Sequence, residues 1–372
     1  MTLAYGVIRP AGGEPRVCAR VAGKVVDLSG LGPEFRRPSL NAFMALGPDA
    51  WRDAHQRVRM LDGPAVDGEL LLPFAVADYV DFYSSLEHAT NLGRLLRPDA
   101  EPLLPNWRWL PVGYHGRAGT VVASGTPIRR PHGQRRPPGA EQPGFGPSTR
   151  LDIELEIGFV VGTPSGLGEP VPVGEALAHV FGLVLVNDWS ARDLQAWEYQ
   201  PLGPFLGKSF ATSISVWVVP LEELEPSRVP LPPQQPPPLD YLRAEPWAYD
   251  LPLEIELNGT VVSRTSARHL YWSLEQQVAH LTVNGASLRT GDLLASGTIS
   301  GPRPDSRGSL IELAWNGAEP LQLPDGSTRS FLEDGDEVAL RAPQLELEVR
   351  GRIEGLADSR LERTAPRPGP TS

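Results

Sequence analysis

Residues 81–91, D-F-Y-S-S-L-E-H-A-T-N, bring an aspartate, a tyrosine, a histidine and an asparagine into one short stretch. No periodic apolar face explains why these polar groups stand together. A lone histidine is more often structural than catalytic, and His55 and His132 look like exposed examples. His88 differs from them because the acid, the tyrosine and the asparagine of this stretch crowd around it. It is therefore the first candidate for proton chemistry.

A second candidate is the alternating stretch L-D-I-E-L-E-I-G-F, residues 151–159. Strict alternation predicts a strand with an apolar face and an opposite face that carries Asp152, Glu154 and Glu156. One interpretation is a half-exposed strand whose acids are solvated. The other is a cation site, because carboxylates two residues apart repel by about 1–4 kcal/mol and a cation between them removes that penalty. The pattern leaves both interpretations open.

Residues 179–199 predict a buried strand and a short helix, with polar groups where the strand ends and along one face of the helix. The apolar run 180–186 indicates a buried strand, and it ends at Asn187-Asp188, which delivers a carboxylate to a rim. A short helix over 191–199 should follow and stop before Pro201. One face of that helix would hold hydrogen-bonding side chains, namely Arg192, Gln195 and Tyr199. An amphipathic helix with a polar outer face explains the same pattern equally well.

Two glycine-rich segments could approach a ligand. G-P-F-L-G-K-S, residues 203–209, fails the spacing of a phosphate-binding loop, so Lys208 needs another role. It is either a partly desolvated cation for an anionic transition state or a surface lysine on a turn. Residues 291–302, G-D-L-L-A-S-G-T-I-S-G-P, predict a buried strand that opens into a loop of small residues.

Composition bounds the fold. The chain has 372 residues, of which 41% are hydrophobic, so it can bury a sizeable core. Its 40 prolines and 38 glycines would interrupt helices throughout and are typical of many short strands joined by turns. We therefore expect a mainly β protein.

The net charge and the residue types that could ligate a metal limit the classes of partner and of metal ion that the protein can bind. A net charge of −11 repels nucleic acid and anionic membrane surfaces. The single Cys18 forms no internal disulfide, and neither a signal peptide nor a membrane span is evident, so we expect a cytoplasmic protein. Carboxylates abound while cysteine clusters and zinc-spaced histidine pairs are missing, which favours Ca²⁺ or Mg²⁺.

The organisation along the chain is read from turns and helical spacing. Residues 15–28 predict two short strands that turn at Ala22-Gly23-Lys24, and residues 39–61 have apolar groups at helical spacing. The proline-rich segment 227–246 should run as an extended surface excursion. The predicted parts are an N-terminal domain, a larger domain and a disordered tail: 1–73, 74–363 and 364–372.

Several of these stretches together resemble the fumarylacetoacetase family. The resemblance rests on D-F-Y-S-S-x-x-H-A-T-N, L-P-V-G-Y-H-G-R, S-G-T-P-I-R-R-P, L-D-I-E-L-E, N-D-W-S-A-R-D-L-Q-A-W-E-Y, P-L-G-P-F-L-G-K-S-F and G-D-L-L-A-S-G-T-I-S-G-P, in order from about residue 4 to about residue 340. It implies a small SH3-like N-terminal barrel, a mixed β-roll catalytic domain and a homodimer. It also implies hydrolysis of the carbon–carbon bond of 4-fumarylacetoacetate to fumarate and acetoacetate, the last step of tyrosine and phenylalanine breakdown.

The resemblance also implies a role for each matching residue. The calcium ligands would be Asp81, Glu154, Glu156 and Asp188, and a magnesium position would involve Asp188, Lys208 and Thr212. His88 would be the general base and Glu312 the acid that orients it. Arg192 and Lys208 would be the cationic groups beside the scissile bond. Substrate contacts would come from Tyr83, Arg97, Tyr114, Gln195, Tyr199 and Thr298.

Two other readings compete with this one. A related acylpyruvate hydrolase or oxaloacetate decarboxylase would use the same metal-binding acids on a smaller keto acid. Arg97, Tyr114 and Gln195 argue against it, because they suit a longer dicarboxylate. A catalytically silent, metal-stabilised scaffold is the third reading, and the variant H88A would distinguish it from an enzyme.

Overall fold

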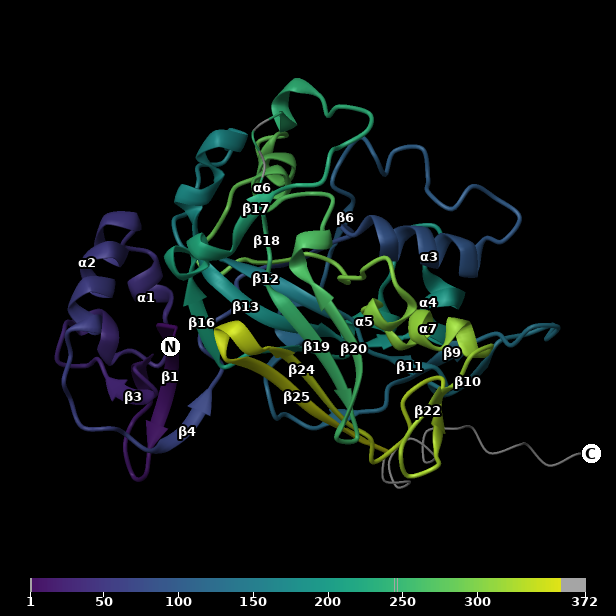
Figure 1. Cartoon of the computed structure of the whole chain (residues 1–372), viewed down its shortest axis with the longest axis horizontal. Helices are drawn as coiled ribbons and strands as arrows, with labels where there is room; N and C mark the ends of the chain where they lie inside the picture. The colour runs from purple at the N-terminus through teal and green to yellow at the C-terminus, as the bar shows by residue number, and fades with distance from the viewer. Residues whose placement is uncertain (1, 244, 246, 356–372) are drawn as a thin grey trace, which may run out of the picture.

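The structure is a computed structural model that describes residues 2–243, 245 and 247–355 (Figure 1). Strands dominate it, which confirms the expected mainly β class. The largest sheet has the order β3-β2-β1-β16-β13-β12-β21-β5-β6, and β4, β15 and β7 pair at its sides. Its strands are β1 (Ala4–Pro10), β2 (Arg16–Val21), β3 (Lys24–Asp27), β4 (Gly68–Leu71), β5 (Tyr79–Phe82), β6 (Gly113–His115), β7 (Val121–Ala123), β12 (Leu155–Val161), β13 (Val180–Asp188), β15 (Thr212–Ile214), β16 (Trp217–Pro220) and β21 (Leu293–Ala295).

A second sheet lies against the first, in front of β12 and β13 in Figure 1. Its order is β20 (Thr260–Ser266), β19 (Pro252–Leu257), β24 (Glu337–Ala342), β25 (Leu347–Glu354) and β8 (Ile128–Arg129). Short two-stranded pairs complete the β structure: β9 (His132–Arg135) with β10 (Gly144–Pro147), β11 (Leu151–Asp152) with β14 (Ser190–Ala191), β17 (Arg228–Pro230) with β18 (Trp247–Tyr249), and β22 (Leu321–Gln322) with β23 (Thr328–Arg329).

The helices are short. The α-helices are α1 (Asn41–Met44), α2 (Pro48–Arg59), α3 (Leu86–Leu96), α4 (Arg192–Glu198), α5 (Leu206–Ser209), α6 (Leu274–Thr282) and α7 (Leu310–Leu313). Turns of 3-10 helix lie at Pro33–Arg36, Ala118–Thr120, Val173–His179, Leu221–Ser227, Asp240–Leu242, Ala267–His269, Pro304–Ser306, Trp315–Gly317 and Pro343–Leu345. In the residues that the structure describes, none of the helices combines the length and the apolar character needed to cross a membrane.

The central strand β13 explains why the run 180–186 is apolar throughout. Leu183 and Leu185 pack into the core between the two sheets, while Val184 and Val186 pack into a second core on the opposite side. A strand that is buried on both faces has no solvated side on which polar residues could alternate. The prediction of a buried strand that ends at Asp188 is therefore confirmed.

The N-terminal region does not close into a barrel among its described residues. Its hairpin β2–β3 turns at the predicted position, but the first strand continues the large sheet, because Tyr5 and Gly6 pair with β16. The SH3-like barrel is therefore not confirmed, and the boundary near Pro73 stays a prediction. Residues 39–61, whose apolar groups lie at helical spacing, form two helices, since Gly47 separates α1 from α2 with a φ of 88°.

His55 and His132 differ from the expectation that both are exposed. His55 is only 4% exposed, and its Nδ1 lies 3.0 Å from Glu222 Oε2. Its ring stacks beside Tyr5 and Phe181, which form the aromatic core under α2. Burial lowers the pKa of His55, so it serves as a neutral core side chain. His132 is half-buried.

The proline-rich segment runs mostly along the surface, as predicted, but it is anchored. Leu242 is buried, and the side chain of Gln234 donates hydrogen bonds to Tyr271, just before α6, and to Gln276 on α6. The predicted disordered tail, 364–372, lies outside the described residues.

Candidate active site

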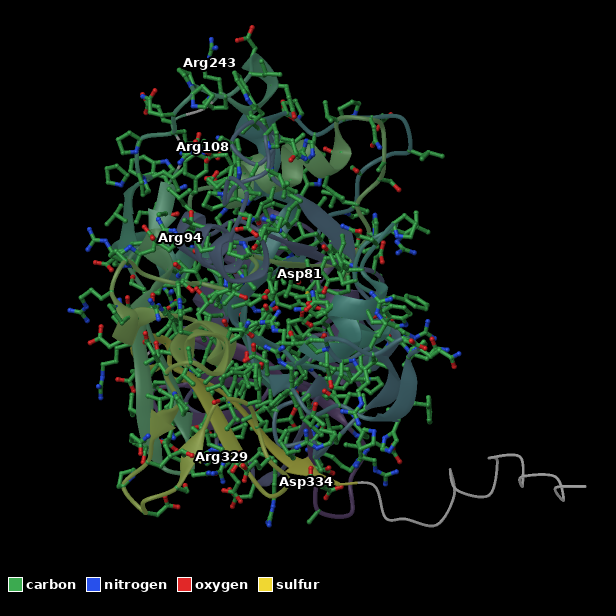
Figure 2. All side chains as sticks on the ribbon, turned by 90° about the vertical axis from the view of Figure 1, so that its right-hand side faces the viewer. Asp81, Arg94, Arg108, Arg243, Arg329 and Asp334 are labelled. Atoms are coloured by element: carbon green, nitrogen blue, oxygen red, sulfur yellow. The ribbon has the colours of Figure 1, made fainter. Side chains whose placement is uncertain are left out.

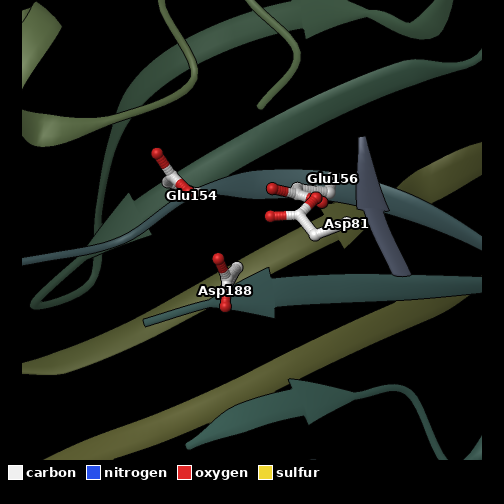
Figure 3. Close-up of side chains that lie close together, drawn as sticks. All are labelled: Asp81, Glu154, Glu156 and Asp188. Carbon is white, nitrogen blue, oxygen red and sulfur yellow. The ribbon is translucent and has the colours of Figure 1, made fainter. Parts of the chain in front are cut away.

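The predicted acids converge at the ends of three strands. Glu154 precedes β12, Glu156 lies on it, Asp188 ends β13, and Asp81 comes from β5 (Figure 3). All four are buried, and each offers an oxygen within 4.8 Å of the others. The solvated-face interpretation of residues 151–159 is therefore wrong. The apolar side chains of this stretch pack into one core, and the acids that alternate with them are buried as well.

One half of this acid cluster is paired with cations of the chain itself. Lys208 donates from Nζ to Glu154 and to Asp188 Oδ2, the latter at 2.5 Å. Arg192 Nη2 donates to Glu154 Oε1 at 2.7 Å. Burial acts to raise the pKa of Glu154, but Arg192, Lys208 and His88 outweigh it and hold that pKa well below its usual range. Glu154 is thus a carboxylate at neutral pH.

The other half, Asp81 and Glu156, has no such partner. Asp81 Oδ1 and Glu156 Oε1 are buried and accept no hydrogen bond in the described part of the chain. Glu156 accepts one bond elsewhere, from Gly297 N–H at 3.1 Å to Oε2. Burial, followed by the repulsion of neighbouring carboxylates, raises the pKa of both acids well above the usual value. These two oxygens are therefore free to ligate a metal ion, and the surrounding carboxylates give the site an excess of negative charge.

That donor set fits a hard divalent cation. Four carboxylates within reach of one another, two of them with an unsatisfied buried oxygen, match the oxygen-only coordination of Ca²⁺ or Mg²⁺. A cation would relieve the repulsion that raises the two pKa values. Thr212 Oγ1 donates to Asp188 Oδ1 at 3.1 Å, and Tyr114 OH donates to Asp188 Oδ2 at 3.2 Å, so both border this set.

His88 stands between the acid cluster and a second buried carboxylate. Its Nδ1 lies 2.6 Å from Glu312 Oε2, and its Nε2 lies 3.7 Å from Glu154 Oε1. The hydrogen-bond network assigns the Nδ1 proton to the bond with Glu312, which leaves Nε2 as the acceptor facing the cluster. The sequence places His88 on the first turn of α3, where Ser85 caps the helix by accepting the His88 N–H. Tyr83 packs edge-on against the imidazole.

Glu312 is held by donors from several segments. Asn91 Nδ2 donates at 2.9 Å, Ser300 Oγ at 2.9 Å and Ser309 Oγ at 2.7 Å. Burial acts to raise the pKa of Glu312, but His88 and these hydrogen bonds outweigh it and keep the pKa below its usual value. The two serines were not among the predicted site residues. Ser300 was within the loop 291–302, whose small residues indicated a close approach of backbone to a ligand.

The remaining predicted substrate contacts lie at different distances from the cluster. Gln195 Oε1 accepts from Arg192 Nη1 at 3.2 Å. Thr298 is buried next to Gly297, and its hydroxyl has no hydrogen-bond partner among the residues that the structure describes. Tyr199 is 42% exposed at the end of α4. Tyr114 and Lys208 line a cavity of about 120 Å³ beside Asp188.

Arg97 is a predicted site residue whose hydrogen bond in the described structure lies outside the acid cluster. Its Nη2 donates to the Pro102 carbonyl at 2.9 Å. It lines a cavity of about 770 Å³ with Arg94 and Arg108, under the loop that follows α3. Figure 2 shows Arg94 and Arg108 to one side of Asp81.

Comparisons with known proteins place these features in a family. Residues 79–353 match the family model described as fumarylacetoacetate hydrolase, C-terminal. The chain is 46% identical over 376 residues to the fumarylacetoacetase of Homo sapiens, covering 91% of this chain and 90% of that protein. It is 46% identical over 375 residues to that of Arabidopsis thaliana, covering 90% and 89%. A fumarylacetoacetate hydrolase of Exiguobacterium antarcticum shares the fold, with a TM-score of 0.61, 18% identity and coverage of 95% and 100%.

Fold, site and relatives together define a hydrolase with a buried acid cluster beside an oriented histidine. The match extends over nearly the whole chain and includes the segments that carry the cluster. The chain belongs to the fumarylacetoacetate hydrolase family.

Proposed function

We propose that the chain catalyses the fumarylacetoacetase reaction, in which water cleaves the carbon–carbon bond of 4-fumarylacetoacetate to give fumarate and acetoacetate. This is the last step of tyrosine and phenylalanine breakdown. The single observation that carries the proposal is the placement of His88 between Glu312 and the acid cluster, in a chain 46% identical to curated fumarylacetoacetases.

His88 is the general base of this mechanism. With Nδ1 held by Glu312 at 2.6 Å, the free Nε2 takes a proton from water, and the resulting hydroxide adds to the carbonyl next to the scissile bond. Glu312 stabilises the imidazolium that forms. When the bond breaks, acetoacetate leaves as an enolate, and the proton held at Nε2 returns to its carbon. The products thus contain one water more than the substrate.

Lys208 and Arg192 supply fixed positive charge beside the reaction. Burial acts to lower the pKa of Lys208, but Asp188 and Glu154 outweigh it and raise the pKa above its usual value, so the ammonium stays charged. The negative charge of the reaction appears on two oxygens in turn. Cations already in place stabilise such oxygens without reorganisation.

Asp81, Glu154, Glu156 and Asp188 would hold Ca²⁺, and Asp188, Lys208 and Thr212 would border a Mg²⁺ position. A divalent cation bound there supplies Lewis-acid polarisation of the two oxygens of a 1,3-diketone. The contacts of Thr212 and Lys208 with Asp188 support the second position.

The substrate itself would contact side chains around this centre. Tyr83, Tyr114, Gln195 and Thr298 lie near the acids, whereas Tyr199 and Arg97 lie further out. To hold the terminal carboxylate of the substrate, Arg97 must turn away from the Pro102 carbonyl. We also propose a homodimer, on the strength of the resemblance, and a cytoplasmic location, as the sequence analysis predicts.

The test is turnover of 4-fumarylacetoacetate, followed by loss of its diketone absorbance, with and without a chelator. We expect turnover with Ca²⁺ or Mg²⁺ and none after chelation. A panel with acylpyruvates and oxaloacetate addresses the related reactions. The enzyme proposal fails if no substrate of the panel is consumed.

The variant H88A separates an enzyme from a metal-stabilised scaffold. Loss of the base should lower kcat by about 10²–10⁴. The metal-induced rise in melting temperature should remain, since His88 is not a metal ligand in this arrangement. His280, a half-buried histidine on α6 bonded to Tyr241, provides a matched control as H280A, with turnover unchanged.

A further inference from the structure

Asp152 is a buried carboxylate to which the mechanism above gives no role. We propose that Asp152 is a positioning residue that holds Arg192 against Glu154 and, at the same time, fixes the helical turn that carries Glu312. The proposal rests on the proposed function only for its kinetic readouts. Asp152 ends β11, is 0% exposed, and lies two residues before Glu154 of the cluster.

The first arm of this arrangement leads to the acid cluster. Arg192 Nε donates to Asp152 Oδ2 at 2.8 Å, and the Nη2 of the same guanidinium donates to Glu154 Oε1 at 2.7 Å. Because a guanidinium is a rigid plane, a bond at Nε determines the direction in which the Nη2 hydrogens point. Asp152 therefore fixes the orientation of the Arg192 guanidinium. Through it, Asp152 also fixes the orientation of the Glu154 carboxylate.

The second arm leads to the base. The N–H of Leu310 donates to Asp152 Oδ1 at 2.8 Å, and the N–H of Ile311 donates to Oδ2 at 3.2 Å. These are the first residues of α7, a single turn whose N-cap residue, Ser309, makes no side-chain cap of its own. The first N–H groups of a helix need acceptors from outside it. Asp152 supplies them for the turn on which Glu312 sits.

One carboxylate thus connects both sides of the catalytic centre. All of its partners named here are donors, so it is held as an acceptor with no alternative hydrogen-bond pattern. A bridge between Glu154 and Ser309 runs alongside and brings the two segments together. Loss of the Asp152 charge would leave Arg192 free to turn and the start of α7 unsatisfied. The distance between His88 Nε2 and Glu154 would then vary.

The variant D152N tests this with little change in shape. We expect kcat to fall by about 10–100-fold with a smaller change in KM, the range typical of partners that orient metal ligands. Titration of the metal-free protein with Ca²⁺ should show weaker binding. The strongly deshielded NMR signal expected for the proton between His88 and Glu312 should shift or broaden.

Asp336 provides the matched control. It is also a buried aspartate, 3% exposed, and it accepts from an arginine, Arg329 Nε at 3.0 Å, from Asn258, and from the Glu333 N–H. It lies far from the site, since Figure 2 shows Arg329 at the lower end of the molecule and Asp81 near its middle. D336N should lower the melting temperature and leave kcat, Ca²⁺ binding and the NMR signal unchanged.

A second pair of variants covers the case in which D152N does not fold. Proline is tolerated at the first position of a helix, and Ser309 already has the extended conformation that precedes proline. L310P removes the N–H that donates to Asp152, whereas L310A loses similar packing but keeps that N–H. We expect kcat of L310P to lie about tenfold below that of L310A, a loss comparable to that of one outer-shell partner.

Two results would overturn the proposal. One is a D152N protein with the kcat, Ca²⁺ affinity and NMR signal of the wild type. The other, if D152N does not fold, is equal kcat for L310P and L310A. Failure of the proposed function looks different: the wild type would not consume the substrate, while the Ca²⁺ titration and the NMR signal would still respond to D152N.

Discussion

The two halves of the acid cluster are held in opposite ways. Glu154 and Asp188 are neutralised by Lys208, with Arg192 as a further partner of Glu154. Asp81 and Glu156 lie beside them, and among the described residues one buried oxygen of each has no hydrogen-bond partner. Burial raises the pKa of Asp188 as it does those of Asp81 and Glu156, so the partners and not the pKa values separate the two halves. The first half is paired within the chain, whereas the second is the half whose charge a bound cation would balance.

This difference assigns separate roles to the two halves. A chain that placed cations against all its acids would leave no charge to attract a metal, and one without Lys208 would repel itself in the folded state. Lys208 is one of two lysines in the sequence, against 32 arginines. Its compact ammonium contacts Glu154 and Asp188 from one nitrogen, whereas the planar guanidinium of Arg192 reaches two carboxylates through separate nitrogens.

The largest effect should follow from removing the cation of the paired half. K208M leaves Glu154 and Asp188 short of a partner, and breaking a buried pair in this way typically costs about 3–5 kcal/mol. Turnover should fall by about 10²–10³, the loss seen when one group that stabilises an oxyanion is removed. Chemical unfolding and steady-state kinetics measure both. K24M, at an exposed lysine of the N-terminal hairpin, is the control.

In the unpaired half, Asp81 and Glu156, removal of a charged group should raise the stability of the metal-free protein, whereas K208M lowers it. Burial and the neighbouring carboxylates disfavour the ionised form of Glu156, as its raised pKa indicates. E156Q removes this unfavourable group, so the metal-free protein should melt at a higher temperature than the wild type. Its Ca²⁺ affinity should fall by more than the 10–100-fold typical of an outer-shell change. Calorimetric titration and melting curves with and without Ca²⁺ test this.

A buried acid remote from the cluster controls for burial alone. Burial raises the pKa of Glu275 on α6, as it does that of Glu156. E275Q should therefore also stabilise the protein, but the temperature shift caused by Ca²⁺ should equal that of the wild type. If E156Q retained the full shift as well, the assignment of the unpaired half to the metal would be wrong.

The sequence predicted which acids belong together but not how they are divided. Alternation placed Asp152, Glu154 and Glu156 on one face, but it did not give their partners. Asp152 accepts from Arg192 and from the first N–H groups of α7, Glu154 accepts from Arg192 and Lys208, and Glu156 accepts from the Gly297 N–H. Periodicity reports which side of a strand a residue occupies, and the partners come from segments far along the chain. The roles of the site residues stay predictions for this reason.

The N-terminal region shows the same limit at the level of the fold. Turn residues located the β2–β3 hairpin correctly, because Ala22 and Gly23 adopt positive φ, which a tight turn requires. Nothing local to residues 4–10 shows that this strand pairs with β16, more than 200 positions away. His55 was misjudged for a similar reason, since Tyr5 and Phe181, which bury it, are distant in sequence.

The smallest effect should come from a carboxylate that is balanced entirely within the chain. Burial acts to raise the pKa of Asp336, but hydrogen bonds from Arg329, Asn258 and the Glu333 N–H outweigh it and hold the pKa below its usual value. A depressed folded pKa means that the stabilisation is complete above the unfolded pKa of about 3.9 and is lost as pH falls through the folded pKa. D336N should therefore cost about 1–3 kcal/mol at pH 7 and progressively less in acid. Urea unfolding of both proteins between neutral and acidic pH measures the convergence. A cost that stayed constant over this range would show that the Asp336 charge contributes nothing, and that a balanced carboxylate in this chain acts only as a hydrogen-bond acceptor.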